Sequence, residues 1–175
     1  MIINLIRYLI SFALLVTVQV LIVNNVQLGG FINPFIYILF ILTLPFDTPG
    51  WILLLVAFLL GLSVDMFMDT MGMNAAATVF MAFCRPLLLK VMAPRDGYEP
   101  ETAPTIRDMG FQWFLTYSAI LIFLHHLVLF FIESGRLNEF FFTILKVIVS
   151  FILSITLIII IQYLFTGSSR QRFAR

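Results

Sequence analysis

The chain has 175 residues, of which 62% are hydrophobic and 11% are charged, and its formal net charge at pH 7 is +1. Soluble domains carry about 25% charged residues, so this composition predicts an integral membrane protein that forms one multi-pass domain over 1–175. The near-neutral charge and the scattered basic residues argue against nucleic-acid binding. The single cysteine, Cys84, excludes an intramolecular disulfide, and the residues around it do not suggest a cysteine-based metal site.

Long apolar runs recur along the chain and predict an all-α fold. A helix rises about 1.5 Å per residue, so about 20 apolar residues cross the hydrocarbon core of a bilayer. Five runs meet this length, at 3–23, 50–68, 73–92, 111–132 and 138–165. The first run ends at Asn24-Asn25 without a small-residue cleavage site, so we expect a membrane span and not a signal peptide.

A sixth apolar run, 31–45, is shorter than the others. Pro34 is tolerated in a first helical turn, and Pro45 would end the helix. We count this run as a sixth span. The alternative is a re-entrant element or one that crosses a locally thin membrane.

The basic residues predict the orientation. With six spans and a cytoplasmic N-terminus, eight of the ten basic residues fall on the cytoplasmic side. They are Arg7, Arg85, Lys90, Arg95, Arg107, Arg170, Arg172 and Arg175. The positive-inside rule therefore places both termini in the cytoplasm, with Arg85 and Lys90 extending toward that surface. Arg136 falls in an outward loop, and the polar, proline-rich segment 93–110 is expected to be a cytoplasmic loop.

Asp65 lies near the end of the apolar run 50–68, where an unpaired carboxylate costs several kcal/mol. We favour an internal structural pair, and the alternatives are proton or ion handling and a helix-end carboxylate that reaches outer headgroups. Lys146 lies at a similar depth in the run 138–165, so we expect it to pair with Asp65 or with Asp69 in an intramembrane polar cluster. The alternative for Lys146 is to extend outward past Glu139.

His125 and His126 are adjacent in the run 111–132, and Glu133 follows it. A helical metal site needs histidines three or four residues apart, whereas adjacent side chains point about 100° apart. We therefore expect these histidines to form hydrogen bonds between helices or at the membrane interface and not to bind a metal. Walker, nucleophile-elbow and HExxH motifs do not occur, so the sequence predicts neither enzymatic activity nor a cofactor.

Small residues surround the junction between the third and fourth long runs. Gly61 and Ala75 would let two helices approach closely, and Gly72 suits a turn that requires positive φ. We therefore expect an αα-hairpin over 50–92, with Asn74 capping its second helix. The 20 phenylalanines are expected to contact lipid or, alternatively, to dock the transmembrane helix of a partner.

An ordered set of residues resembles the rod-shape-determining protein family MreD. The set is Pro34, Leu44-Pro45, Gly50, Gly61-Leu62-x-x-Asp65 and Gly72-x-Asn74-Ala75, and the resemblance is strongest over 33–90. It implies a non-enzymatic scaffold of the cell-elongation machinery in the bacterial cytoplasmic (inner) membrane, which helps to position lateral peptidoglycan synthesis and to set cell shape. The implied partners are a MreC-like single-span protein, RodA with its class B penicillin-binding protein, and, indirectly, MreB.

The same resemblance leaves a second function open. Members are similar in architecture to the substrate-binding subunits of energy-coupling-factor transporters, so the alternative is a membrane subunit that captures a small, vitamin-type molecule. The turn Met66-Phe-Met-Asp69-Thr departs from the family pattern, in which small residues commonly follow the aspartate.

Overall fold

The computed structural model describes residues 2–23, 33–99, 102–135 and 140–167, and within these ranges the chain forms helices and no strands. The helices are α1 (Ile2–Leu21), α2 (Leu39–Leu42), α3 (Gly50–Met68), α4 (Met73–Val91), α5 (Ile106–Met109), α6 (Phe111–Ser134) and α7 (Phe140–Gly167). Four of them, α3, α4, α6 and α7, are long and apolar enough to cross a membrane, and α1 contains a shorter apolar stretch. The chain is thus all-helical and has the character of a multi-pass membrane protein.

The α3–α4 hairpin has the predicted boundaries because its turn is encoded locally. Asp69 ends α3 in the left-handed conformation (φ 53°), and Gly72 precedes α4 with φ 80°. Glycine adopts this conformation without a steric penalty, and aspartate tolerates it better than most residues. The prediction of a positive φ at Gly72 is therefore confirmed.

The expectation of a helix across 31–45 is wrong. Residues 31 and 32 lie outside the described residues, and from 33 to 45 only Leu39–Leu42 is α-helical. The segment 33–38, which we call the core segment, runs without helical structure through the interior, and from Pro34 to Leu42 every residue is buried. Backbone of this kind is tolerated at membrane depth only where protein surrounds it and satisfies its polar groups.

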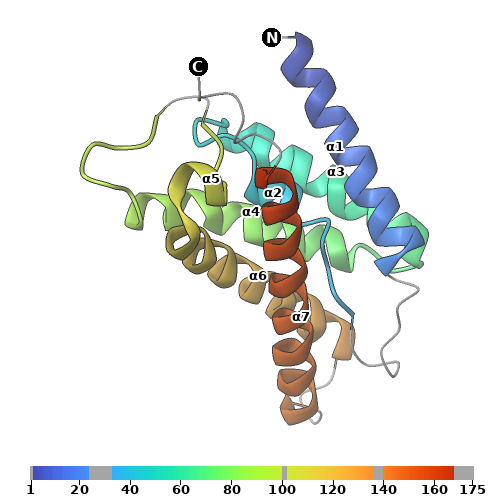
Figure 1. Ribbon diagram of the computed structural model, residues 1–175. Coiled ribbons are helices and arrows are strands. Elements are labelled where there is room, and N and C mark those ends of the chain that lie inside the picture. The colour runs from blue at the N-terminus through green and yellow to red at the C-terminus, as the bar shows by residue number, and fades with distance from the viewer. Residues whose placement is uncertain (1, 24–32, 100–101, 136–139, 168–175) are drawn as a thin grey trace.

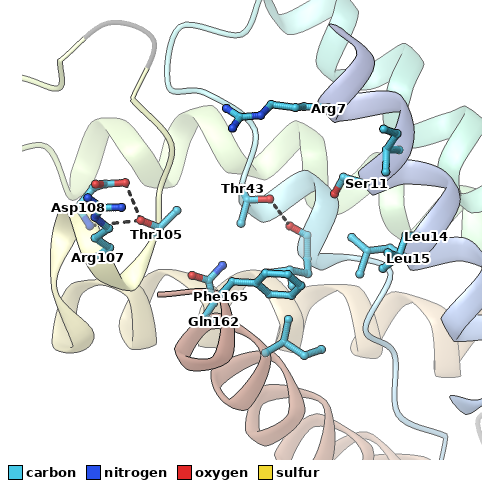
Figure 2. Close-up of a pocket in the computed structure, with 13 residues that line it drawn as sticks. Arg7, Ser11, Leu14, Leu15, Thr43, Thr105, Arg107, Asp108, Gln162 and Phe165 are labelled. Carbon is cyan, nitrogen blue, oxygen red and sulfur yellow. Dashed lines mark hydrogen bonds between the residues drawn. The ribbon is translucent and has the colours of Figure 1, made fainter. Parts of the chain in front are cut away.

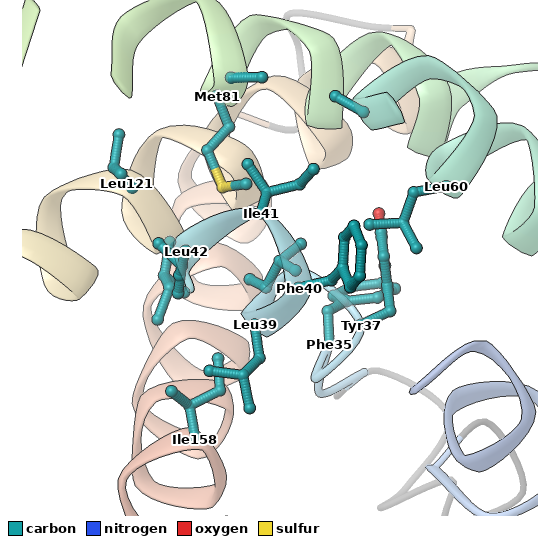
Figure 3. Packing of buried hydrophobic residues seen from close by; sticks show 14 of the residues in the cluster. Phe35, Tyr37, Leu39, Phe40, Ile41, Leu42, Leu60, Met81, Leu121 and Ile158 are labelled. Atoms are coloured by element: carbon teal, nitrogen blue, oxygen red, sulfur yellow. The ribbon is translucent and has the colours of Figure 1, made fainter. Parts of the chain in front are cut away.

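The short helix α2 occupies the centre of the bundle. Figure 1 shows α2 between α1, α7 and the α3–α4 pair, while α4 packs on α6 and α6 on α7. In Figure 3 the side chains of α2 lie among residues that come from the four long helices. Those labelled are Leu60 of α3, Met81 of α4, Leu121 of α6 and Ile158 of α7. The hydrophobic core is thus assembled around a four-residue helix.

One end of the bundle collects basic residues, and we call it the basic end. The start of α1, the end of α7 and the segment between α4 and α5 lie there (Figure 1). An aromatic stack joins the segment between α4 and α5 to the α2–α3 connection and to the start of α6, with ring centroids 4.0 Å apart between Phe46 and Tyr98 and 5.9 Å between Tyr98 and Trp113. Partial burial raises the pKa of Tyr98, so its hydroxyl stays protonated and donates to the Leu89 carbonyl at 3.0 Å.

The polar segment 93–110 is mostly loop, as predicted, but it contains α5. Thr105 caps this helix, since its hydroxyl accepts from the Asp108 amide at 3.2 Å. Four of the basic residues assigned by sequence to one side or the other lie outside the described residues. They are Arg136, Arg170, Arg172 and Arg175.

Candidate functional site

The Asp65 carboxylate is buried at the α3–α4 turn and accepts four hydrogen bonds. Its Oδ1 accepts from Thr70 Oγ1 at 2.5 Å and from the Asn74 amide and Asn74 Nδ2, both at 3.0 Å. Its Oδ2 accepts from the Ala75 amide at 2.9 Å. Because Gly72 offers α4 no side-chain cap, Asp65 of α3 satisfies the first turn of α4 from the neighbouring helix. A carboxylate is also favoured there by the helix dipole.

Asn74 does not cap α4, contrary to the expectation, because it lies inside the helix as its second residue. Its side chain joins the turn instead, donating from Nδ2 to Asp65 and, at 3.0 Å, to Thr70 Oγ1. The turn is thus held by a closed set of polar contacts and not by one cap.

Gly61 allows the two helices to approach closely enough for Asp65 to reach α4. A Cβ added at Gly61 would lie 2.7 Å from the Ala75 amide nitrogen and 2.7 Å from the Asn74 carbonyl oxygen. Real Cβ atoms essentially never come this close to backbone, so a larger residue at position 61 must push the helices apart.

The predicted cluster of Asp65, Asp69 and Lys146 is not formed. Lys146 Nζ lies 2.8 Å from Glu133 Oε1 and 4.7 Å from the centroid of the Phe130 ring, so its partners belong to α6. Asp69 is exposed in the turn. The sequence gives the depth of each residue but not which helices are neighbours, and α7 packs on α6 while the Asp65 carboxylate is bonded to α4.

Tyr37 extends the polar network from the turn to the bundle centre. Its hydroxyl lies 2.8 Å from His125 Nε2 and 3.0 Å from Thr78 Oγ1, and it donates to Asn74 Oδ1 at 3.3 Å. These contacts join the core segment to α4 and α6. His125 Nδ1 is buried and has no hydrogen-bond partner among the described residues.

His126 forms a separate, directional chain of hydrogen bonds. Its Nδ1 lies 2.8 Å from the Ile122 carbonyl, which can only accept, so this nitrogen carries the proton. Its Nε2 then accepts from Ser154 Oγ at 2.9 Å, and Ser154 Oγ accepts from the Phe35 amide at 2.8 Å. Both histidines thus form hydrogen bonds between elements, and the described residues contain no group of three or more potential metal ligands.

Polar side chains from α1 and α7 satisfy the backbone of the core segment. Gln19 Nε2 donates to the Pro34 carbonyl at 3.0 Å, and Gln19 Oε1 accepts from the Ile36 amide at 2.7 Å. Ser150 Oγ accepts from the Asn33 amide at 3.3 Å. Sequence reasoning missed these residues, although an amide and serines within apolar runs were a visible signal that some backbone needed partners.

Arg85 is buried, contrary to the expectation that it extends to the membrane surface. It donates from Nε to Tyr117 Oη at 2.8 Å and from Nη2 to the carbonyls of Leu44 and Pro45. Tyr117 in turn donates to the Leu42 carbonyl at 3.0 Å. The guanidinium therefore satisfies carbonyls just beyond the C-terminus of α2, where the helix dipole favours a cation, while Tyr117 satisfies the Leu42 carbonyl at that terminus.

An apolar groove runs along the outer surface between α3 and α4 toward the basic end, and we call it the α3/α4 groove. It encloses about 450 Å³ and is lined by Gly50, Leu53, Leu54, Ala82, Phe83, Pro86, Leu87 and Lys90. Phe83 and Leu87 are about 70% exposed on successive turns of α4, and Lys90 follows them. Apolar side chains in this position face lipid or another protein.

Comparison of the chain with protein-family models, with curated proteins and with solved structures finds no match. The chemistry of the site must therefore be inferred from its geometry. Its carboxylate, guanidinium and hydroxyl groups bind backbone and one another, which is an arrangement that fixes helices in place.

Proposed function

We propose that this chain is a non-enzymatic scaffold of the bacterial cytoplasmic membrane that binds a MreC-like single-span partner. In this proposal it crosses the membrane six times, with residues 33–45 forming the second crossing and both termini in the cytoplasm. It would help to position lateral peptidoglycan synthesis by RodA and its class B penicillin-binding protein, with an indirect link to MreB. The family resemblance supplies the identity of the partners.

The observation that carries the scaffold function is the closed bonding of the buried polar residues. Asp65, Arg85 and His126 each bind backbone or a neighbouring side chain, and none of the three lines the α3/α4 groove. A site for a small polar molecule needs convergent polar groups that face a cavity. Interior bonding of this kind supports a rigid body whose recognition surface is its apolar exterior.

The α3/α4 groove is the surface that suits the partner helix. Association of helices in a membrane depends on close van der Waals packing, which small residues promote. Gly50 and Ala82 leave space in the groove, while Phe83 and Leu87 form a ridge beside it. Lys90 at the basic end would attract an acidic residue that follows the transmembrane helix of the partner.

The test is purification of the tagged chain from its native membrane in mild detergent, with bound proteins identified by mass spectrometry. We expect a stoichiometric MreC-like protein with the wild type. The double variant Phe83→Ala/Leu87→Ala should retain about a tenth of it or less, since interface anchors dominate binding energy. The matched control is Phe141→Ala/Leu164→Ala, which removes the same two side-chain types from positions elsewhere that are at least as exposed, and it should retain the partner.

Two results would contradict the proposal. Equal loss of partner in both double variants would show that the groove is not the docking surface. Energy-coupling ATPase subunits bound in place of a MreC-like protein would show that the chain is the substrate-binding subunit of a transporter.

A further inference from the structure

A second cavity, of about 530 Å³, lies at the basic end between α1, α2, α5 and α7, and we call it the α1/α7 cavity (Figure 2). Its polar end contains Arg7 from α1, Arg107 from α5, and the hydroxyl groups of Thr43 and Thr105. Figure 2 shows the Arg7 guanidinium and the Gln162 amide reaching into the same space from α1 and α7. Four elements that are distant in sequence thus contribute to one polar pocket.

The charges of this cavity favour an anion. Two arginines and one acidic residue, Asp108, line it. Asp108 is already bonded, since its Oδ2 accepts from Thr105 Oγ1 at 2.6 Å. Within the described part of the chain, Arg7 and Arg107 form no ion pair, so both guanidinium groups keep donors for a ligand. Guanidinium groups bind phosphate with paired, charge-assisted hydrogen bonds.

The rest of the cavity favours a ligand with an apolar tail. Beyond the arginines most of its wall consists of apolar side chains from α1 and α7, including Ile10, Leu14 and Phe165, with Ser11 and Gln162 among them. These three are 49–73% exposed, so the cavity is open toward the surrounding membrane. From Arg7 to Leu14 the helix rises about 10 Å, which is enough to lie along the upper part of an acyl chain. The volume also exceeds what an inorganic anion requires.

We propose that the α1/α7 cavity binds an anionic glycerophospholipid from the bilayer. Its headgroup phosphate lies between Arg7 and Arg107, and one acyl chain lies against Leu14 and Phe165. Basic pockets between transmembrane helices on the cytoplasmic side are suited to such headgroups. The lipid joins α1 to α5 and α7, so its binding stabilises the packing of the two terminal helices. This inference does not depend on the MreC-like partner.

The test is native mass spectrometry of the full chain in detergent, titrated with phosphatidylglycerol, with phosphatidylcholine, and with phosphatidylglycerol in the presence of inorganic phosphate. We expect phosphatidylglycerol to bind about tenfold more tightly than phosphatidylcholine, because both lipids carry a phosphate but the choline cation of phosphatidylcholine is repelled by the two arginines. Millimolar inorganic phosphate should not displace it. Equal binding of the two lipids would overturn the proposal, and displacement by phosphate would show a site for free anions instead.

Variants locate the site. Arg7→Gln and Arg107→Gln should each weaken phosphatidylglycerol binding about tenfold, since each removes one charge-assisted contact. Arg95→Gln removes the same charge from an exposed position outside the cavity and should leave binding unchanged. An equal loss in all three variants would mean that diffuse surface charge attracts the lipid, and would overturn the site. Phe165→Ala, which keeps every charge, should also weaken binding because it removes a contact with the acyl chain, and unchanged binding would overturn the placement of that chain.

Discussion

Two charged residues of opposite sign perform the same task at opposite ends of helices. Asp65 accepts from amides in the first turn of α4, and Arg85 donates to carbonyls just beyond the end of α2. Each charge matches the sign that the helix dipole favours at that terminus. In a membrane, where water cannot satisfy these groups, such contacts replace the ordinary caps. A buried charge in this chain is therefore explained by backbone that needs a partner.

At the residue scale, the change Asp65→Asn tests this explanation. The amide nitrogen of asparagine cannot accept a hydrogen bond, so either the Ala75 amide or the donors on Oδ1 lose their acceptor. We expect a loss of about 2 kcal/mol in the free energy of unfolding, in line with the removal of a helix cap. Thermal unfolding in detergent should show a lower midpoint. Asp69→Asn is the control, because Asp69 is exposed and asparagine tolerates its left-handed conformation. Equal midpoints for the two variants would refute the capping role.

At the scale of elements, Gly61 sets the spacing of α3 and α4. Gly61→Ala places a methyl group against the backbone of α4, which cannot rotate away as a side chain can. We expect a destabilisation of about 1–3 kcal/mol, the usual cost of overpacking. Gly50→Ala is the matched control on the same helix, since a Cβ there meets nothing within 4 Å. A Gly61→Ala variant as stable as Gly50→Ala would mean that α3 and α4 are not in close backbone contact at Gly61.

The core segment gives a second prediction at this scale. Gln19→Leu keeps the size of the side chain but leaves the Pro34 carbonyl and the Ile36 amide without their partner. Each unsatisfied buried group costs about 1–3 kcal/mol. We therefore expect a clear fall in stability and faster hydrogen exchange at the Ile36 amide. Gln112→Leu, at an exposed position of α6, should change neither measurement. Slow exchange retained in Gln19→Leu would show that the segment does not depend on α1.

The elements that could be predicted from sequence are those whose signals are local. The bounds of α3 and α4 follow from apolar runs and from the turn at Asp69 and Gly72. The core segment could not be predicted, because its hydrogen bonds come from Gln19 and Ser154, which are 17 and 119 residues away from their partners Ile36 and Phe35. The predicted pairing of Lys146 with Asp65 or Asp69 was wrong for a related reason. Depth in the membrane does not specify which helices are neighbours, and Lys146 pairs with Glu133. Asp65 and the two histidines were singled out from sequence whereas Gln19 and Ser154 were not, and the partners of all of them required the fold.

At the scale of the whole molecule, the two ends differ in charge. Arg7 and Arg107 line the cavity at the basic end, and Lys90 lies at the same end of α4. The opposite end contains the α3–α4 turn. Basic residues close to helix ends favour the cytoplasmic side, so this asymmetry predicts how the bundle is oriented. In this orientation the α3/α4 groove and the α1/α7 cavity would both reach the cytoplasmic leaflet, where the proposed partner helix and the proposed lipid would bind.

Single cysteines test this orientation together with the number of crossings. The variants are made in a Cys84→Ala background. Ile22→Cys marks an exposed position at the end of α1, and Met71→Cys marks one in the α3–α4 turn. Asp47→Cys and Arg95→Cys mark exposed positions toward the basic end. We expect a membrane-impermeant maleimide to label the first pair in cells whose inner membrane is intact, and the second pair only after that membrane is opened. Residues 33–45 separate positions 22 and 47, so opposite accessibility at these two positions means that the core segment and α2 carry the chain across the bilayer. The same accessibility at both would make 33–45 a re-entrant element and leave an odd number of crossings. A complete reversal of the pattern would keep the six crossings but place the arginines outside, against the charge rule.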